Sequence, residues 1–68
     1  MNYGKNQIAL LKFLEKYPNR WNTFKGRKAI DAARRLSNKD SNVLILKLPK
    51  SNWVHVFLKM PQMLIKQN

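Results

Sequence analysis

The chain contains no cysteine, so neither a disulfide framework nor a thiolate metal site can hold its fold together. It is also short, at 68 residues, and a domain of this size buries only about 60% of the surface that its unfolded chain exposes. Its stability must therefore come from a small core of apolar side chains. Hydrophobic residues make up 44% of the sequence, which is enough for such a core and argues against disorder. We expect a single domain over residues 1–68, with its core within residues 6–59.

The net charge is the strongest indication of function. Fourteen lysine and arginine residues stand against three acidic residues, which gives a formal net charge of +11. An excess of this size favours association with a polyanion. The three acids are scattered, His55 is the only histidine, and there are only two glycines, so the chain offers no paired carboxylates, no nucleophile with its base and no glycine-rich phosphate loop. We expect a protein that is not an enzyme and that uses no metal or cofactor.

Hydrophobic spacing predicts two helices. The first covers residues 8–17, with Asn6 as its N-cap and a stop at Pro18. Its apolar stripe consists of Ile8, Leu11 and Leu14, flanked by Leu10 and Tyr17. The second covers residues 27–39 and has a basic face opposite a stripe of small and apolar residues. That stripe consists of Ala29, Ile30, Ala33 and Leu36.

The C-terminal half predicts a β-hairpin. Residues 43–48 and 53–58 are rich in β-branched, aromatic and other apolar side chains, and residues 49–52 form a loop suited to joining antiparallel strands. Both faces of this hairpin are apolar, so we expect each to be partly covered. Between the helices, residues 21–25 fit either one helical turn or an extended segment. We expect the two large rings of this connector, Trp21 and Phe24, to lie in the core rather than to stack on bases.

This order of elements resembles a minimal winged-helix DNA-binding domain over residues 6–59. The resemblance rests on the apolar first helix, on the run Arg34-Arg35-Leu36 late in the basic helix, and on the hairpin that follows it. It implies an α+β fold with two main helices, room for a short connecting turn, and a C-terminal hairpin wing. The chain departs from the family in one respect, because residues 21–25 leave space for only about one turn where the family has a separate helix.

The resemblance implies that the basic helix enters the major groove while its flanking cations contact phosphates. Arginine can donate two hydrogen bonds to guanine, whereas lysine more often acts as a point charge on phosphate. The hairpin tip, as a wing, would contact the DNA backbone or the minor groove. The residues expected to bind nucleic acid are Lys25, Arg27, Lys28, Arg34, Arg35, Asn38, Lys39, Lys47 and Lys50.

Four functions stay open from the sequence. Double-stranded DNA is the favoured partner, for a transcriptional regulator of the kind that phages, plasmids and other mobile elements encode. The alternatives are an architectural DNA binder, an RNA-binding module and a basic protein that docks on an acidic protein surface. Exposed side chains at Trp53, His55 and Phe57 would favour RNA, whereas steep salt dependence without specificity would favour the architectural binder.

The remaining expectations concern location and assembly. The N-terminus is polar and lysines interrupt every apolar run, so no segment reaches the roughly 20 apolar residues that a membrane span needs. We therefore expect a cytoplasmic protein, associated with the nucleoid if it binds DNA, and no membrane partner. Residues 60–68 are expected to form a tail or a short docking helix. The oligomeric state stays open, with a dimer as one option.

Overall fold

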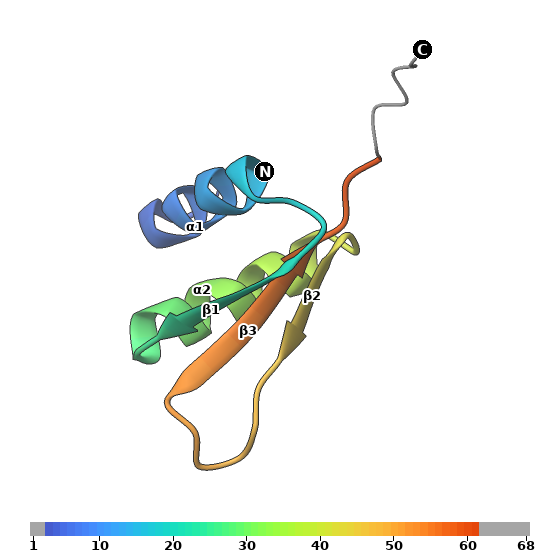
Figure 1. Cartoon of the computed structure of the whole chain (residues 1–68). Helices are drawn as coiled ribbons and strands as arrows, with labels where there is room; N and C mark the ends of the chain where they lie inside the picture. The colour runs from blue at the N-terminus through green and yellow to red at the C-terminus, as the bar shows by residue number, and fades with distance from the viewer. Residues whose placement is uncertain (1–2, 62–68) are drawn as a thin grey trace.

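The computed structural model describes residues 3–61. Two helices and three strands follow one another as α1 (Lys5–Lys16), β1 (Trp21–Lys25), α2 (Arg27–Lys39), β2 (Val43–Leu46) and β3 (Trp53–Leu58). The strands form one antiparallel sheet in the order β1-β3-β2 (Figure 1). The expected α+β class is confirmed. The tail or docking helix predicted for residues 60–68 lies almost wholly outside the described residues.

The core lies between the two helices and one face of the sheet. Helix α2 packs against α1 and against all three strands, and it lies directly behind the sheet in Figure 1. The small residues Ala32 and Ala33 are buried in α2, which allows close approach of its neighbours. The largest fully buried side chains come from both layers and are Leu14, Leu36, Val43, Val54 and Val56.

Helix α2 has the predicted bounds, but α1 begins earlier than the sequence indicates. Its N-cap is Gly4, which has an extended backbone, so the prediction of Asn6 as N-cap is wrong. The earlier start places Gln7 inside α1, where its side chain is buried and accepts a hydrogen bond of 3.0 Å from Nζ of Lys39, the last residue of α2. The first turn of α1 therefore belongs to the packed interface between the two helices. Ile8 points away from the core and is exposed, and the buried side of α1 carries Gln7, Leu10 and Leu14.

Residues 21–25 form a strand, so the connecting helical turn is absent from this part of the chain. β1 pairs with β3 along its whole length, and Trp21 lies opposite Phe57. The turn before the strand uses Asn19 at φ 59°, and the turn after it uses Gly26 at φ 104°. The hairpin therefore belongs to a three-stranded sheet, with β3 as the central strand, instead of standing alone as a two-stranded wing.

The first hairpin strand ends at Leu46, before the predicted end at residue 48, and the connection between the strands covers residues 47–52. Within it, the backbone N–H of Ser51 donates to the carbonyl oxygen of Leu48 (3.2 Å), a four-residue turn with Pro49 at its second position. Pro49 has no N–H to offer to a ladder, and Lys50 adopts φ 69°. These two residues end the pairing early and give a longer loop.

Both helices cover the same side of the sheet, so the other face is open as far as residues 3–61 are concerned. The predicted partial cover of this face comes from neighbouring side chains and not from a second layer, since His55 and Phe57 are half-buried whereas Trp53 is exposed. Trp21 projects from this face and is 50% exposed, which contradicts the expected core position of that ring. Phe24 faces the other way and packs against the core as expected. The two helices that the structure describes suffice to cover one side of the sheet only.

Candidate nucleic-acid interface

The exposed face of α2 carries most of the cations that the sequence singled out. Side chains at i, i+4, i+7 and i+8 of a helix lie on one side, and this relationship joins Arg27, Asp31, Arg34 and Arg35. All four are exposed, as is Asn38 one turn further on. The buried residues of α2 occupy the opposite side. The amphipathic pattern thus turns the guanidinium groups outward.

A groove of about 300 Å³ separates α2 from the connection between β2 and β3. We call it the loop groove. It brings cations from two distant segments together, since Arg27 and Arg34 come from the helix and Lys47 from the start of the 47–52 connection. Asp31 is the one acid among its lining residues. The lining is completed by Ile30, Ser51 and Asn52.

Hydrogen bonds of the backbone and of two side chains hold the loop groove in shape. The N–H of Gly26 donates to the carbonyl oxygen of Asn52 (2.9 Å), which ties the loop to the start of α2. Ser51 Oγ accepts from the backbone N–H of Trp53 (3.1 Å), and Lys47 Nζ donates to the carbonyl oxygen of Leu48 (2.8 Å). The polar groups of the loop therefore have fixed positions relative to the helix.

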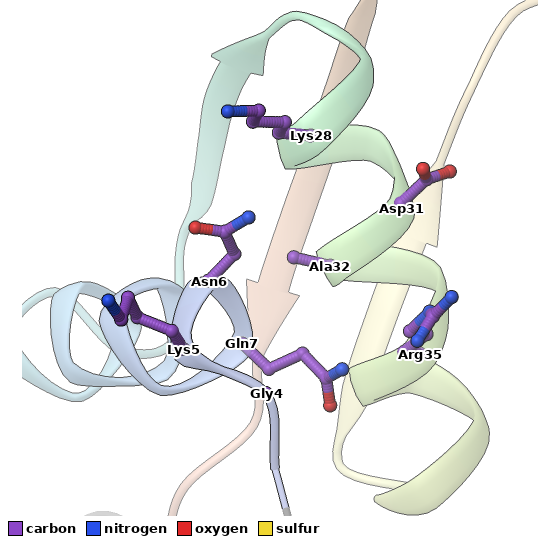
Figure 2. A pocket seen from close by; sticks show the side chains of 8 residues that line it. All are labelled: Gly4, Lys5, Asn6, Gln7, Lys28, Asp31, Ala32 and Arg35. Atoms are coloured by element: carbon purple, nitrogen blue, oxygen red, sulfur yellow. The ribbon is translucent and has the colours of Figure 1, made fainter.

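A second groove, of about 490 Å³, lies on the other side of α2, between that helix and the first turn of α1. Figure 2 shows Lys5 on α1 and Lys28, Asp31 and Arg35 on α2 around it. Lys5 was not predicted as a site residue, since the sequence pattern placed the start of α1 too late. Asp31 lines both grooves, so a single carboxylate lies between two sets of cations.

Three of the predicted site residues lie elsewhere. Lys25 is on β1, with its ammonium group 5.4 Å from the centre of the Trp53 ring. Lys39 Nζ bonds Gln7 of α1 and lies 4.9 Å from the centre of the Tyr3 ring, so these contacts join α2 to α1 and to the residues before it. Lys50 is exposed within the 47–52 connection. The structure thus groups Arg27, Lys28, Arg34, Arg35, Asn38 and Lys47 around α2.

The remaining chemistry of residues 3–61 is limited. His55 Nδ1 is hydrogen-bonded to Thr23 Oγ1 at 2.8 Å, and no cluster of three His, Cys, Asp or Glu side chains that could hold a metal ion occurs in this part of the chain. Its two helices are also too short and too polar to cross a membrane. Comparison with protein-family models, with curated proteins and with solved structures finds no significant match to the chain.

Proposed function

We propose that this protein binds double-stranded DNA through the exposed face of α2 and the neighbouring 47–52 connection, without catalysis and without a cofactor. The observation that carries the proposal is the loop groove, in which Arg27 and Arg34 of α2 lie across from Lys47. An α-helix with its side chains is about 10–12 Å across, close to the roughly 12 Å width of the major groove. A helix whose exposed face is basic, beside a basic loop, suits that groove and its phosphate walls.

The residues have different roles in this proposal. Arg34 and Arg35 project from the second half of α2 and have the planar donor pair that can read guanine O6 and N7. Arg27, Lys28 and Lys47 are placed at the flanks of the helix, where they would contact phosphates and set the register. Lys50, in the loop, would reach the backbone beyond the groove, as the wing does in the family that the sequence resembles.

The biological role that we propose is that of a small DNA-binding regulator, of the kind that phages and plasmids encode, located on the nucleoid. Arg34 and Arg35 can make the bidentate base contacts that a regulator needs, and an architectural binder would use the same cations without reading bases. The winged-helix resemblance supports the regulatory role, although β1 occupies the place of that family's intervening helix. A site-selection experiment that enriches one sequence over bulk DNA is expected.

The proposal is tested by fluorescence anisotropy with a labelled random DNA duplex and the matching RNA duplex, over about 50–200 mM salt. The variant Arg34→Ala/Arg35→Ala removes two cations from α2. Its matched control, Lys12→Ala/Lys16→Ala, removes two exposed cations from α1. We expect the α2 variant to lose at least about tenfold in DNA affinity, and its salt slope to fall by about one for each phosphate that is no longer neutralised. The control should lose only a few-fold.

Two results would overturn the proposal. Equal losses in the two double variants would mean that overall charge and not the α2 surface binds DNA. Equal affinity for RNA and DNA duplexes would mean that no major groove is read, because the deep, narrow RNA major groove excludes side chains. Far-UV circular dichroism of both variants checks that each keeps its fold.

A further inference from the structure

The open face of the sheet carries a row of rings along its central strand. Trp53, His55 and Phe57 alternate on β3 and therefore project to the same side. On β1, Trp21 lies opposite Phe57, with ring centres 5.3 Å apart and planes inclined at 57°. The two indoles are among the most exposed large hydrophobic groups of the chain, at 50% for Trp21 and 46% for Trp53. We call these four residues the ring face.

From this arrangement we propose that the ring face is a second nucleic-acid site, which binds single strands by stacking their bases. Alternate residues on a strand are about 7 Å apart, which leaves room along β3 for one base on exposed Trp53 and another at the far end of the row. There Trp21 and half-buried Phe57 contact each other and would offer one shared platform. Sheets that bind single-stranded nucleic acid stack two or three bases on exposed aromatic side chains in this way. Duplex bases are already stacked on each other and cannot reach these rings.

The charges at the ring face fit a nucleic-acid backbone. Lys25 lies over the Trp53 ring at one end of the row, and the exposed Lys59 follows β3 just beyond Phe57 at the other. None of the three acids of the chain is on a strand, since Glu15 is in α1, Asp31 is in α2, and Asp40 is the C-cap of α2. A single-stranded nucleic acid that lies along β3 would therefore meet a cation at each end of the row of rings.

His55 gives the middle of the row a polar contact. Its Nδ1 atom is 2.8 Å from Thr23 Oγ1 on the neighbouring strand. The hydrogen bond fixes the orientation of the imidazole within the face. A fixed ring with a polar edge can stack on a base and also bond a base edge or a sugar hydroxyl, which an aliphatic residue at the same place could not do.

A second copy of the chain is the main competing occupant, because Leu44, Leu46 and Leu48 on and after β2 are also exposed. The positive charge of the chain argues against self-association through this face. A face-to-face dimer would combine two chains of formal charge +11 and would bring Lys25 and Lys59 of both copies into one interface. The like charges oppose self-association, whereas a phosphate backbone neutralises them and releases its counterions.

The test uses tryptophan fluorescence, since the two tryptophans of the chain are both on the ring face. The probes are a thymidine 15-mer, a uridine 15-mer and inorganic polyphosphate of matched charge. The oligonucleotides should quench the fluorescence, and polyphosphate should bind more weakly with little quenching. In anisotropy with the labelled 15-mers, Trp21→Leu and Trp53→Leu keep an apolar side chain without a ring, and each should lose about tenfold in affinity. Trp21→Phe and Trp53→Phe, which keep a ring, should lose much less.

Separate variants distinguish duplex binding at the exposed face of α2 from single-strand binding at the ring face. Arg34→Ala/Arg35→Ala should keep most of its affinity for the 15-mers, so a failure of duplex binding leaves this inference intact. Unchanged affinity of both leucine variants for the 15-mers would overturn it, as would equal quenching by polyphosphate. A wild-type dimer in sedimentation equilibrium that becomes monomeric in the leucine variants would also overturn it, because a second copy would then cover the rings.

Discussion

The backbone N–H of Gly26 donates a hydrogen bond of 2.9 Å to the carbonyl oxygen of Asn52, and this contact joins the start of α2 to the loop that faces it. The two residues are far apart in the sequence, and β1 and β3 bring them together, because Lys25 pairs with Trp53 in the sheet. The same glycine accepts from the N–H of Ile30 in the first turn of α2 (3.0 Å). The loop groove therefore depends on the geometry of one backbone position.

Gly26→Ala should destabilise the fold and weaken duplex binding together. Gly26 has φ 104° and ψ 158°, a region that is essentially restricted to glycine and costs about 1–3 kcal/mol for other residues. An added Cβ would meet nothing within 4 Å, so the cost is backbone strain and not a clash. We expect urea denaturation to show a loss of unfolding free energy in that range. Gly4→Ala is the comparison without backbone strain, since Gly4 has φ −69°, although its added Cβ would lie 3.3 Å from Gln7 Nε2. Equal losses in the two variants would show that the backbone at Gly26 is not special.

Asn19 should hold the end of β3 through its side chain. Its Nδ2 donates to the Met60 carbonyl oxygen and its Oδ1 accepts from the Met60 N–H, both at 3.0 Å. Asn19 also has φ 59°. Asn19→Gly removes the side-chain bonds alone and should cost about 1 kcal/mol of unfolding free energy. Asn19→Ala adds left-handed strain and should cost about 1 kcal/mol more. An alanine variant as stable as the glycine variant would show that the backbone relaxes without cost.

Lys39→Met should act on stability and hardly on DNA binding. The sequence placed Lys39 among the nucleic-acid contacts, but its ammonium group bonds the buried Gln7 and lies over Tyr3. Removing the donor to a buried amide oxygen costs about 1–3 kcal/mol, which thermal or urea unfolding would measure. Its decrease in duplex affinity should match that of Lys12→Met, which removes an exposed cation from α1. If Lys39→Met lowers duplex affinity as much as Arg34→Ala does, Lys39 belongs to the DNA-binding surface after all.

The sequence predicted the helical parts better than the sheet. The bounds of α2 follow from its strong amphipathic pattern and from Gly26 and Asp40 on either side. The sequence does not decide the state of β1, because its five residues carry too short an alternation to exclude a helical turn, and its pairing with β3 is a long-range contact. The exposure of Trp21 follows from that pairing and from the placement of both helices on one side. The local sequence pattern predicts neither the pairing of β1 with β3 nor the placement of both helices on one side.

The candidate interface was predictable to a similar degree. Charge and helical spacing identified the arginines of α2, since both signals are local. They did not show that Lys25 and Lys39 point elsewhere, because that depends on Trp53 and Gln7, which lie far away in the sequence. Lys5 lines the second groove because α1 begins at that residue, earlier than the spacing predicts. Contacts between distant segments therefore decide which cations share a surface.

Asp31→Asn should tighten duplex binding. Asp31 is exposed, is the one acid of α2, and lines both grooves that flank the helix, so its carboxylate would repel the phosphates that the surrounding cations attract. Two charges about 4–5 Å apart near a protein surface interact by roughly 1 to 4 kcal/mol before screening by salt. We therefore expect an affinity gain of a few-fold at about 0.05 M salt that shrinks as salt rises.

The control for this change is Glu15→Gln, which removes the same charge from the exposed side of α1. If DNA lies along α2, the control should change affinity much less than Asp31→Asn, because Glu15 lines neither groove. Anisotropy titrations of both variants at two salt concentrations measure the difference. An equal gain in both would mean that the duplex responds to net charge alone, and α2 would then lose its assignment as the DNA-binding surface.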